Sequence, residues 1–205
     1  PFEQKIKKPI QSGFKQIDPF VFIEGEKIYL YYVKVANGAN RIFVSELNSD
    51  FSVLKNSSPV QCIEATKQWE NVENANWSVT EGPSVFKLNS KYYLIYSANH
   101  FKSVDYSVGY AVADSPFGPW KKSGEGPILN RKFVNLNGTG HGDIFKDEDG
   151  WNYVFHTHFS DKKVNPRKTA IIQVNWNDGE KGYKELTFKP DSMYFLKYNL
   201  QRKNN

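Results

Sequence analysis

The sequence predicts an all-β fold. Aromatic residues make up 16% of the 205 residues, and they fall with β-branched residues in short alternating runs. Gly, Pro, Asn and Asp separate these runs, which is the pattern of strands joined by turns. No segment has a convincing helical period. The third observation is that the runs repeat along the chain at a nearly constant interval.

The repeat is clearest in the positions of proline and aromatic residues. The interval from Pro19 to Pro83 also separates Phe22, Tyr29 and Tyr32 from Phe86, Tyr93 and Tyr96, and a third copy holds Phe145, Tyr153 and His156. Each unit then adds another alternating strand, at 41–47, 106–112 and 170–176. A repeat of about four antiparallel strands is typical of a propeller blade. A β-sandwich of about a dozen strands would explain the alternation, but it would not explain the interval.

Three units are too few to close a propeller, which has about four to eight blades. Pro1-Phe2 followed by Lys7-Lys8-Pro9-Ile10 resembles the end of the second unit, where Pro116-Phe117 precedes Lys121-Lys122 and Pro127-Ile128. We therefore expect the chain to begin in the tail of an earlier blade. The predicted organisation is a partial propeller domain over residues 1–195, with its N-terminal blades absent, and a polar basic tail over 196–205.

Composition argues against several classes of protein. The net charge is +5, but the basic residues are scattered, so a nucleic-acid-binding β protein is the weaker alternative. No apolar run approaches the roughly 20 residues that span a bilayer, so no membrane partner is expected. The lone Cys62 has no internal disulfide partner and indicates no compartment. We expect a soluble protein, and because the N-terminal blades are expected to be absent, secretion is left without a prediction.

Two carboxylates are the main candidates for chemistry. Asp18 and Glu81 stand at the openings of strands in successive units. In a propeller the heads of the innermost strands gather around one axis, so the two side chains would face each other across a pocket. Neighbouring carboxylates in a partly desolvated site raise one another's pKa, as a general acid requires. Two flanking acids are the machinery of glycoside hydrolysis. Either residue alone would instead be read as a turn residue at a strand entrance.

Several motifs in order resemble glycoside hydrolase family 43. They are Ile17-Asp18-Pro19, Glu81-Gly82-Pro83, Tyr92-Tyr93-Leu94-Ile95-Tyr96-Ser97, Ser115-Pro116-Phe117-Gly118-Pro119-Trp120 and Gly138-Thr139-Gly140-His141-Gly142. The resemblance covers residues 1 to about 180. It implies a five-bladed β-propeller of the kind found in β-xylosidases, α-L-arabinofuranosidases and arabinanases, and it implies that this chain corresponds to the C-terminal three blades.

The resemblance also implies roles for individual residues. Glu81 is similar to the general acid of the family, and Asp18 to the carboxylate that orients this acid and raises its pKa. His141 matches the central histidine that contacts sugar or lies beside a calcium ion on the axis. Arg167 matches a late arginine that hydrogen-bonds a sugar hydroxyl. Trp77, by its proximity to Glu81, is our first choice for stacking on a sugar, ahead of Trp69, Phe101, Tyr106 and Trp151. Inter-blade packing is the alternative for each of these aromatic residues.

Metal and cofactor expectations are limited. His156 and His158 alternate on one strand and, with His141, could form a zinc site, but hydrogen-bonded histidines beside the axis are the alternative that we favour. A structural calcium on the axis would need oxygen ligands. No cofactor is expected for the chemistry itself.

We therefore expect an inverting glycosidase acting on plant-type oligo- or polysaccharides. The general base of the family is an Asp at the head of the first blade, and no Asp here stands in the matching motif. The chain alone is thus expected to be inactive. A non-catalytic carbohydrate-binding propeller is the alternative. Exposed blade edges would also favour self-association.

Overall fold

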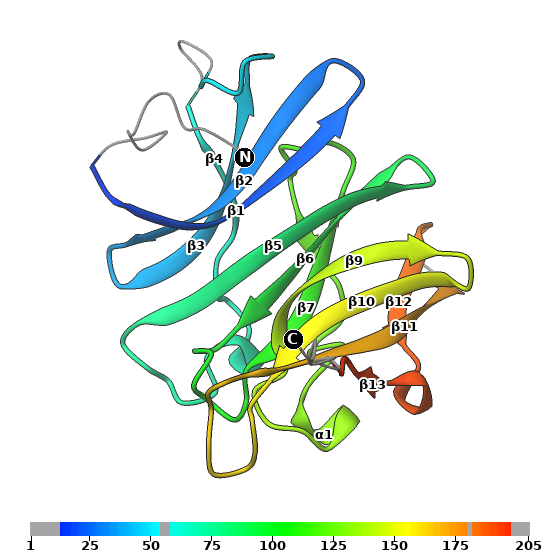
Figure 1. The fold of residues 1–205 in the computed structure, drawn as a ribbon. Coiled ribbons are helices and arrows are strands. Elements are labelled where there is room, and N and C mark those ends of the chain that lie inside the picture. The colour runs from blue at the N-terminus through cyan, green and yellow to red at the C-terminus, as the bar shows by residue number, and fades with distance from the viewer. Residues whose placement is uncertain (1–12, 54–57, 180–181, 198–205) are drawn as a thin grey trace, which may run out of the picture.

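The structure, a computed structural model, describes residues 13–53, 58–179 and 182–197. It consists of three antiparallel units, which we call the first, second and third blades (Figure 1). The strands of the first blade are β1 (Lys15–Glu24), β2 (Lys27–Ala36), β3 (Ala39–Leu47) and β4 (Val60–Ile63). The strands of the second blade are β5 (Ser78–Leu88), β6 (Lys91–Ala98), β7 (Ser107–Ala113) and β8 (Lys121–Lys122).

The third blade contains β9 (Gly140–Asp147), β10 (Gly150–Thr157), β11 (Lys168–Asp178) and β12 (Lys184–Phe188), and β13 (Tyr194–Phe195) pairs with β11. Helical structure among the described residues is confined to α1 (Arg131–Val134) and two 3₁₀ turns, η1 (Gln68–Glu70) and η2 (Pro190–Ser192). The predicted all-β fold and the three repeated units are therefore confirmed.

The first strand of each blade lies on the inner side of the arrangement. Strand β5 contacts β1 on one side and β9 on the other, and Figure 1 shows the three strands following one another across the molecule. A short parallel pairing of Ala39-Asn40 in β3 with Ser78-Val79 in β5 connects the first two blades. The openings of β1, β5 and β9, where the candidate residues stand, therefore converge.

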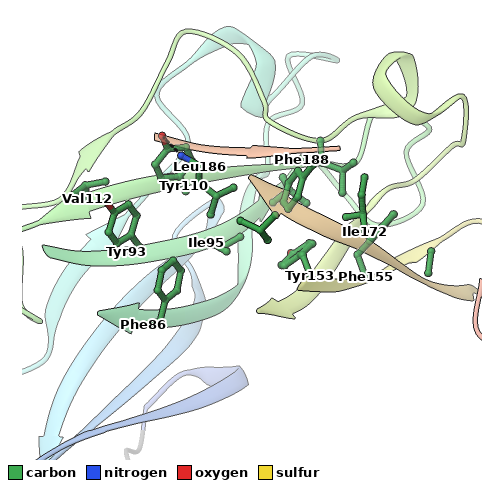
Figure 2. Close-up of a cluster of buried hydrophobic side chains, with 14 residues drawn as sticks. Phe86, Tyr93, Ile95, Tyr110, Val112, Tyr153, Phe155, Ile172, Leu186 and Phe188 are labelled. Carbon is green, nitrogen blue, oxygen red and sulfur yellow. Dashed lines mark hydrogen bonds between the residues drawn. The ribbon is translucent and has the colours of Figure 1, made fainter. Parts of the chain in front are cut away.

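Two of the three hydrophobic clusters of the described residues lie between the blades. The side chains of strand β6 alternate between the two faces of the second blade and so enter both clusters. Tyr93 and Ile95 face the third blade, where they pack in a cluster with Tyr153, Phe155 and Ile172 (Figure 2). The intervening residues of β6 face the first blade in a separate cluster. The middle strand is thus buried on both sides, which explains its unbroken apolar run.

Tyrosine hydroxyl groups cross both interfaces between blades. Tyr31 of β2 donates a hydrogen bond to the carbonyl oxygen of Pro116 at 2.7 Å, and Tyr93 of β6 donates to the carbonyl oxygen of Lys184 at 2.8 Å. Each ring fills space between sheets while its hydroxyl group satisfies a backbone acceptor on the next blade. Inter-blade packing thus accounts for much of the high aromatic content.

Some expectations fall outside what the structure describes. The N-terminal motifs within 1–12 and most of the predicted tail, 198–205, lie outside the described residues. The domain boundary at residue 195 and self-association stay predictions. Within the described ranges, no helix combines the length and the apolar character that a membrane span requires.

Candidate active site

A pocket of about 340 Å³ lies where the inner strands of the first two blades open. Asp18 from β1, Glu81 from β5 and His141 from β9 all line it, together with Arg167 from the segment before β11. These are four of the five residues singled out from the sequence. The pocket therefore gathers candidate residues from all three blades, although their roles stay predictions.

Each inner strand opens with an irregular residue in the left-handed backbone region. These residues are Asp18 (φ 53°), Gly82 (φ 60°) and His141 (φ 53°), and the strand pairing shifts register at all three places. A β-bulge of this kind re-aims the neighbouring side chains. Asp18 is therefore structurally equivalent to Gly82, and Glu81 stands one position earlier in its own strand, which refines the near equivalence expected from the sequence.

The carboxyl group of Glu81 is buried and accepts hydrogen bonds from two neighbouring side chains. Glu81 is only 8% exposed. The hydroxyl group of Tyr106 donates to Oε1 at 2.9 Å, and the amide Nδ2 of Asn40 donates to Oε2 at 3.3 Å. Both donors are themselves buried, so the orientation of the carboxyl group is fixed by packed neighbours.

The surroundings raise the pKa of Glu81 above its ordinary value. Burial is the largest cause, because it penalises the charged form. The negative charge of Asp18 raises the pKa further. The hydrogen bonds from Tyr106 and Asn40 and the positive charge of Arg167 favour the ionised form, but they do not outweigh burial. The site thus favours a carboxyl group that keeps its proton, as a general acid must.

The side chain of Asp18 is hydrogen-bonded to the backbone beside Glu81. Its Oδ2 accepts a hydrogen bond from the N–H of Gly82 at 3.1 Å and lies 3.8 Å from Nδ1 of His141. A side chain at Gly82 would place its Cβ 3.2 Å from Cγ of His141. Glycine is therefore favoured there for two reasons, the positive φ and the close approach of the histidine.

His141 is held in place by the glycine-rich segment that precedes and follows it. Its backbone N–H donates to Oγ of Ser97 at 2.7 Å. A Cβ at Gly140 would lie 2.5 Å from Cε1 of Tyr106, and one at Gly142 would lie 2.0 Å from the carbonyl oxygen of Val154. Both flanking positions are therefore packed too closely for a side chain.

Arg167 brings an unused donor to the pocket. Its guanidinium carbon lies 5.6 Å from the ring centroid of Phe101, and both residues line the pocket. Among the described residues, its Nη1 is buried without a hydrogen-bond partner. A buried N–H group without an acceptor is costly, so this atom is suited to a ligand oxygen.

Trp77 lies beside this pocket and does not line it. It borders an adjoining pocket of about 640 Å³, with which the first shares Asn40 and His100. Trp77 is 45% exposed, and its Nε1–H donates to Oδ1 of Asn40 at 3.0 Å. Trp69 and Trp151, also considered for sugar stacking, instead pack against Tyr96 and against neighbouring aromatic rings.

Two residues that complete the site were missed by sequence reasoning. Asn40 had no signal, since it is a polar residue within a strand and its contact with Glu81 spans 41 positions. Tyr106 was considered only as an aromatic surface for sugar. It is in fact fully buried and acts as a hydrogen-bond donor.

The remaining histidines do not form a metal centre. Nδ1 of His156 lies 3.3 Å from the hydroxyl group of Thr169, and Nε2 of His158 lies 3.0 Å from the carbonyl oxygen of Phe101. In the part of the chain that the structure describes, no group of three His, Cys, Asp or Glu side chains is arranged to hold a metal ion. The axial calcium therefore finds no side-chain ligand set here and stays a prediction.

Comparison with known proteins agrees with this geometry. The sequence profile described as glycosyl hydrolases family 43 matches residues 1–180. A β-D-galactofuranosidase of Aspergillus niger is 27% identical over 186 residues, which cover 87% of this chain and 49% of that protein. The chain therefore spans about half the length of this curated relative.

Two solved structures are similar over most of the chain. One is a thermostable family-43 glycoside hydrolase, with a TM-score of 0.79, 37% identity, and coverage of 90% of this chain and 61% of that one. The other is an endo-1,4-β-xylanase from Bacteroides thetaiotaomicron, with a TM-score of 0.79, 40% identity, and coverage of 92% and 63%.

Proposed function

The chain belongs to glycosyl hydrolases family 43, and on this basis we propose that it forms part of an inverting glycosidase acting on xylan- or arabinan-type glycans. Its fold is that of the five-bladed β-propellers of this family, of which it covers about three blades. The observation that carries the proposal is the buried carboxyl group of Glu81, held by Tyr106 and Asn40 in a pocket shared with Asp18.

Glu81 acts as the general acid. Its raised pKa favours the protonated form, which donates its proton to the glycosidic oxygen as the bond to the leaving group breaks. The hydrogen bonds from Tyr106 and Asn40 then stabilise the carboxylate that remains. The pocket thus supports both protonation states that the reaction passes through.

Asp18 tunes and orients this acid. Its negative charge disfavours ionisation of Glu81, and its hydrogen bond to Gly82 fixes the backbone from which the Glu81 side chain extends. Because Oδ2 of Asp18 is engaged by the N–H of Gly82 and lies near His141, we assign this carboxylate to positioning and not to water activation.

Other residues bind the sugar. Arg167 offers its unpartnered Nη1 to a sugar hydroxyl, and His141 contributes an imidazole ring to the same pocket. Trp77 offers an exposed ring face in the adjoining pocket, where a further sugar of the chain can stack. The two pockets together accommodate a sugar on each side of the bond that is cleaved.

An inverting reaction also needs a general base. This second carboxylate lies roughly 6.5–9.5 Å from the acid and activates a water molecule. We assign that role to none of the described carboxylates and expect it from the part of the family fold that this chain does not span. The chain alone is therefore expected to bind glycans without turning them over.

A paired assay tests this proposal. Aryl β-xyloside, aryl α-L-arabinofuranoside and aryl β-D-galactofuranoside are offered to this chain and to a protein extended by two upstream blades. Turnover by the extended protein alone supports a glycosidase and identifies its sugar. Turnover by neither, with glycan binding retained, would favour the alternative of a non-catalytic carbohydrate-binding propeller.

A further inference from the structure

The amide of Asn40 connects the two pockets. It lies in β3, only 8% exposed, between an exposed indole and a buried carboxyl group. Its Oδ1 accepts the N–H of Trp77 at 3.0 Å, and its Nδ2 donates to Oε2 of Glu81 at 3.3 Å. The three side chains thus form a hydrogen-bonded relay that leads from the surface to the candidate acid.

The direction of this relay follows from the chemistry of its ends. An indole N–H can only donate a hydrogen bond, so the amide group turned toward Trp77 must be the carbonyl oxygen. The NH₂ group of Asn40 therefore faces Glu81 and always offers Oε2 a donor. Tyr106, the partner of Oε1, has a hydroxyl group that can rotate to donate or to accept.

A protonated carboxyl group has one hydroxyl oxygen and one carbonyl oxygen, and the carbonyl oxygen is the better acceptor for a fixed donor. We propose that Trp77 and Asn40 are positioning residues that keep Oε2 of Glu81 as the carbonyl oxygen and place the transferable proton on Oε1. This inference rests on the proposed function only in taking Glu81 as the acid.

Other charged or titratable groups line the same pocket as Glu81 and come from separate elements. Asp18 and Lys15 belong to β1, His141 to β9 and Arg167 to the segment before β11. His100, which follows β6, lines the same pocket.

Trp77 carries no charge, and it borders the adjoining pocket. Its replacement by phenylalanine removes the indole N–H while keeping an aromatic ring. A change in the pKa of Glu81 in this variant therefore reports the relay and not a change in the charges around the pocket.

The test is a ¹³C NMR titration of the Glu81 carboxyl group in this chain, assigned by loss of its signal in E81Q. In W77F the Asn40 amide is free to turn, so that its oxygen accepts a hydrogen bond from Oε2–H. This stabilises the acid form, and we expect the pKa of Glu81 to rise. In an N40A background the relay is absent, and W77F should then leave this pKa unchanged.

A double-mutant cycle of this kind isolates the pairwise effect. No shift in W77F, or the same shift in both backgrounds, would overturn the proposal. W69F is the matched control, because within the described residues the Trp69 N–H has no acceptor, and it should not move the pKa. If N40A does not fold, the comparison of W77F with W69F still tests the proposal. Equal pKa values of Glu81 in these two variants would contradict the relay. No substrate is used, so failure of the proposed function leaves this test intact.

Discussion

The carboxylate of Asp18 accepts a hydrogen bond from the backbone N–H of Gly82 at 3.1 Å, which fastens the first blade to the residue that follows Glu81. The spacing of the two carboxyl groups is therefore set by a backbone contact between blades. This contact gives Asp18 two separable effects on Glu81, one through its charge and one through the position of the strand.

The D18N variant separates these effects. An asparagine oxygen can still accept the N–H of Gly82, but the negative charge that raises the pKa of Glu81 is lost. We expect the pKa of Glu81 to fall, which moves the basic limb of the pH–rate profile of the extended protein to lower pH. D18A, which also loses the hydrogen bond, serves for comparison. An unchanged or higher pKa in D18N would contradict the charge effect.

Stability should also depend on the protonation of Glu81. A carboxyl group whose pKa is raised on folding stabilises the protein fully below its unfolded pKa, and this contribution is lost as the pH rises through the folded pKa. The decline should therefore begin near the ordinary value of 4.5 and extend upward. Urea unfolding across pH should show a flatter profile for E81Q than for the parent chain. Parallel profiles would argue against a raised pKa.

Gly82 allows the contact between the strand opening and His141 to be tested. We expect G82A to destabilise the protein because alanine is strained at φ +60° and its Cβ would lie 3.2 Å from His141. Gly25 provides a matched control, since it has the same φ of +60° but a Cβ there would meet nothing within 4 Å. The G25A variant should cost about 1 kcal/mol from backbone strain alone. Equal losses of unfolding free energy in both variants would show that the close approach is unimportant.

A buried ion pair connects η1 to β8. Glu70 has a fully buried side chain, and its Oε2 lies 2.5 Å from Nζ of Lys122, while its Oε1 accepts the hydroxyl group of Tyr96 at 2.6 Å. Removing one partner leaves a buried charge uncompensated, so K122M should lower the unfolding free energy by about 3 kcal/mol. The neighbouring Lys121 is exposed, and K121M should change the unfolding free energy by less than about 0.5 kcal/mol. Similar values for the two variants would contradict the role of the pair.

The sequence predicted the features that repeat and missed those formed by distant contacts. Tyr29, Tyr93 and Tyr153 recur because each blade needs aromatic packing at equivalent positions, so both the strands and their order could be foreseen. Asn40 and Tyr106 meet Glu81 across 41 and 25 positions, and no local pattern marks such contacts.

The two carboxylates, Asp18 and Glu81, were located from the sequence, but their exact correspondence was not. The repeat located both strand openings and treated Asp18 and Glu81 as nearly equivalent, and the left-handed backbone shows that Asp18 corresponds to Gly82, one position after Glu81. A shift of one position in a strand changes which face a side chain occupies, and a bulge hides this shift from the alternation pattern. Arg167 was found by family resemblance alone, because its segment follows no repeat.

The central claim, that Glu81 is the general acid, is tested most directly by the leaving-group dependence of E81Q in the extended protein. Glutamine has the same volume but no proton to donate. For the sugar identified by the paired assay, hydrolysis of the alkyl glycoside should fall by about 10²–10⁴-fold. Hydrolysis of the dinitrophenyl glycoside, whose leaving group needs no protonation, should change little. Equal losses on both substrates, or no loss on the alkyl glycoside, would contradict the assignment.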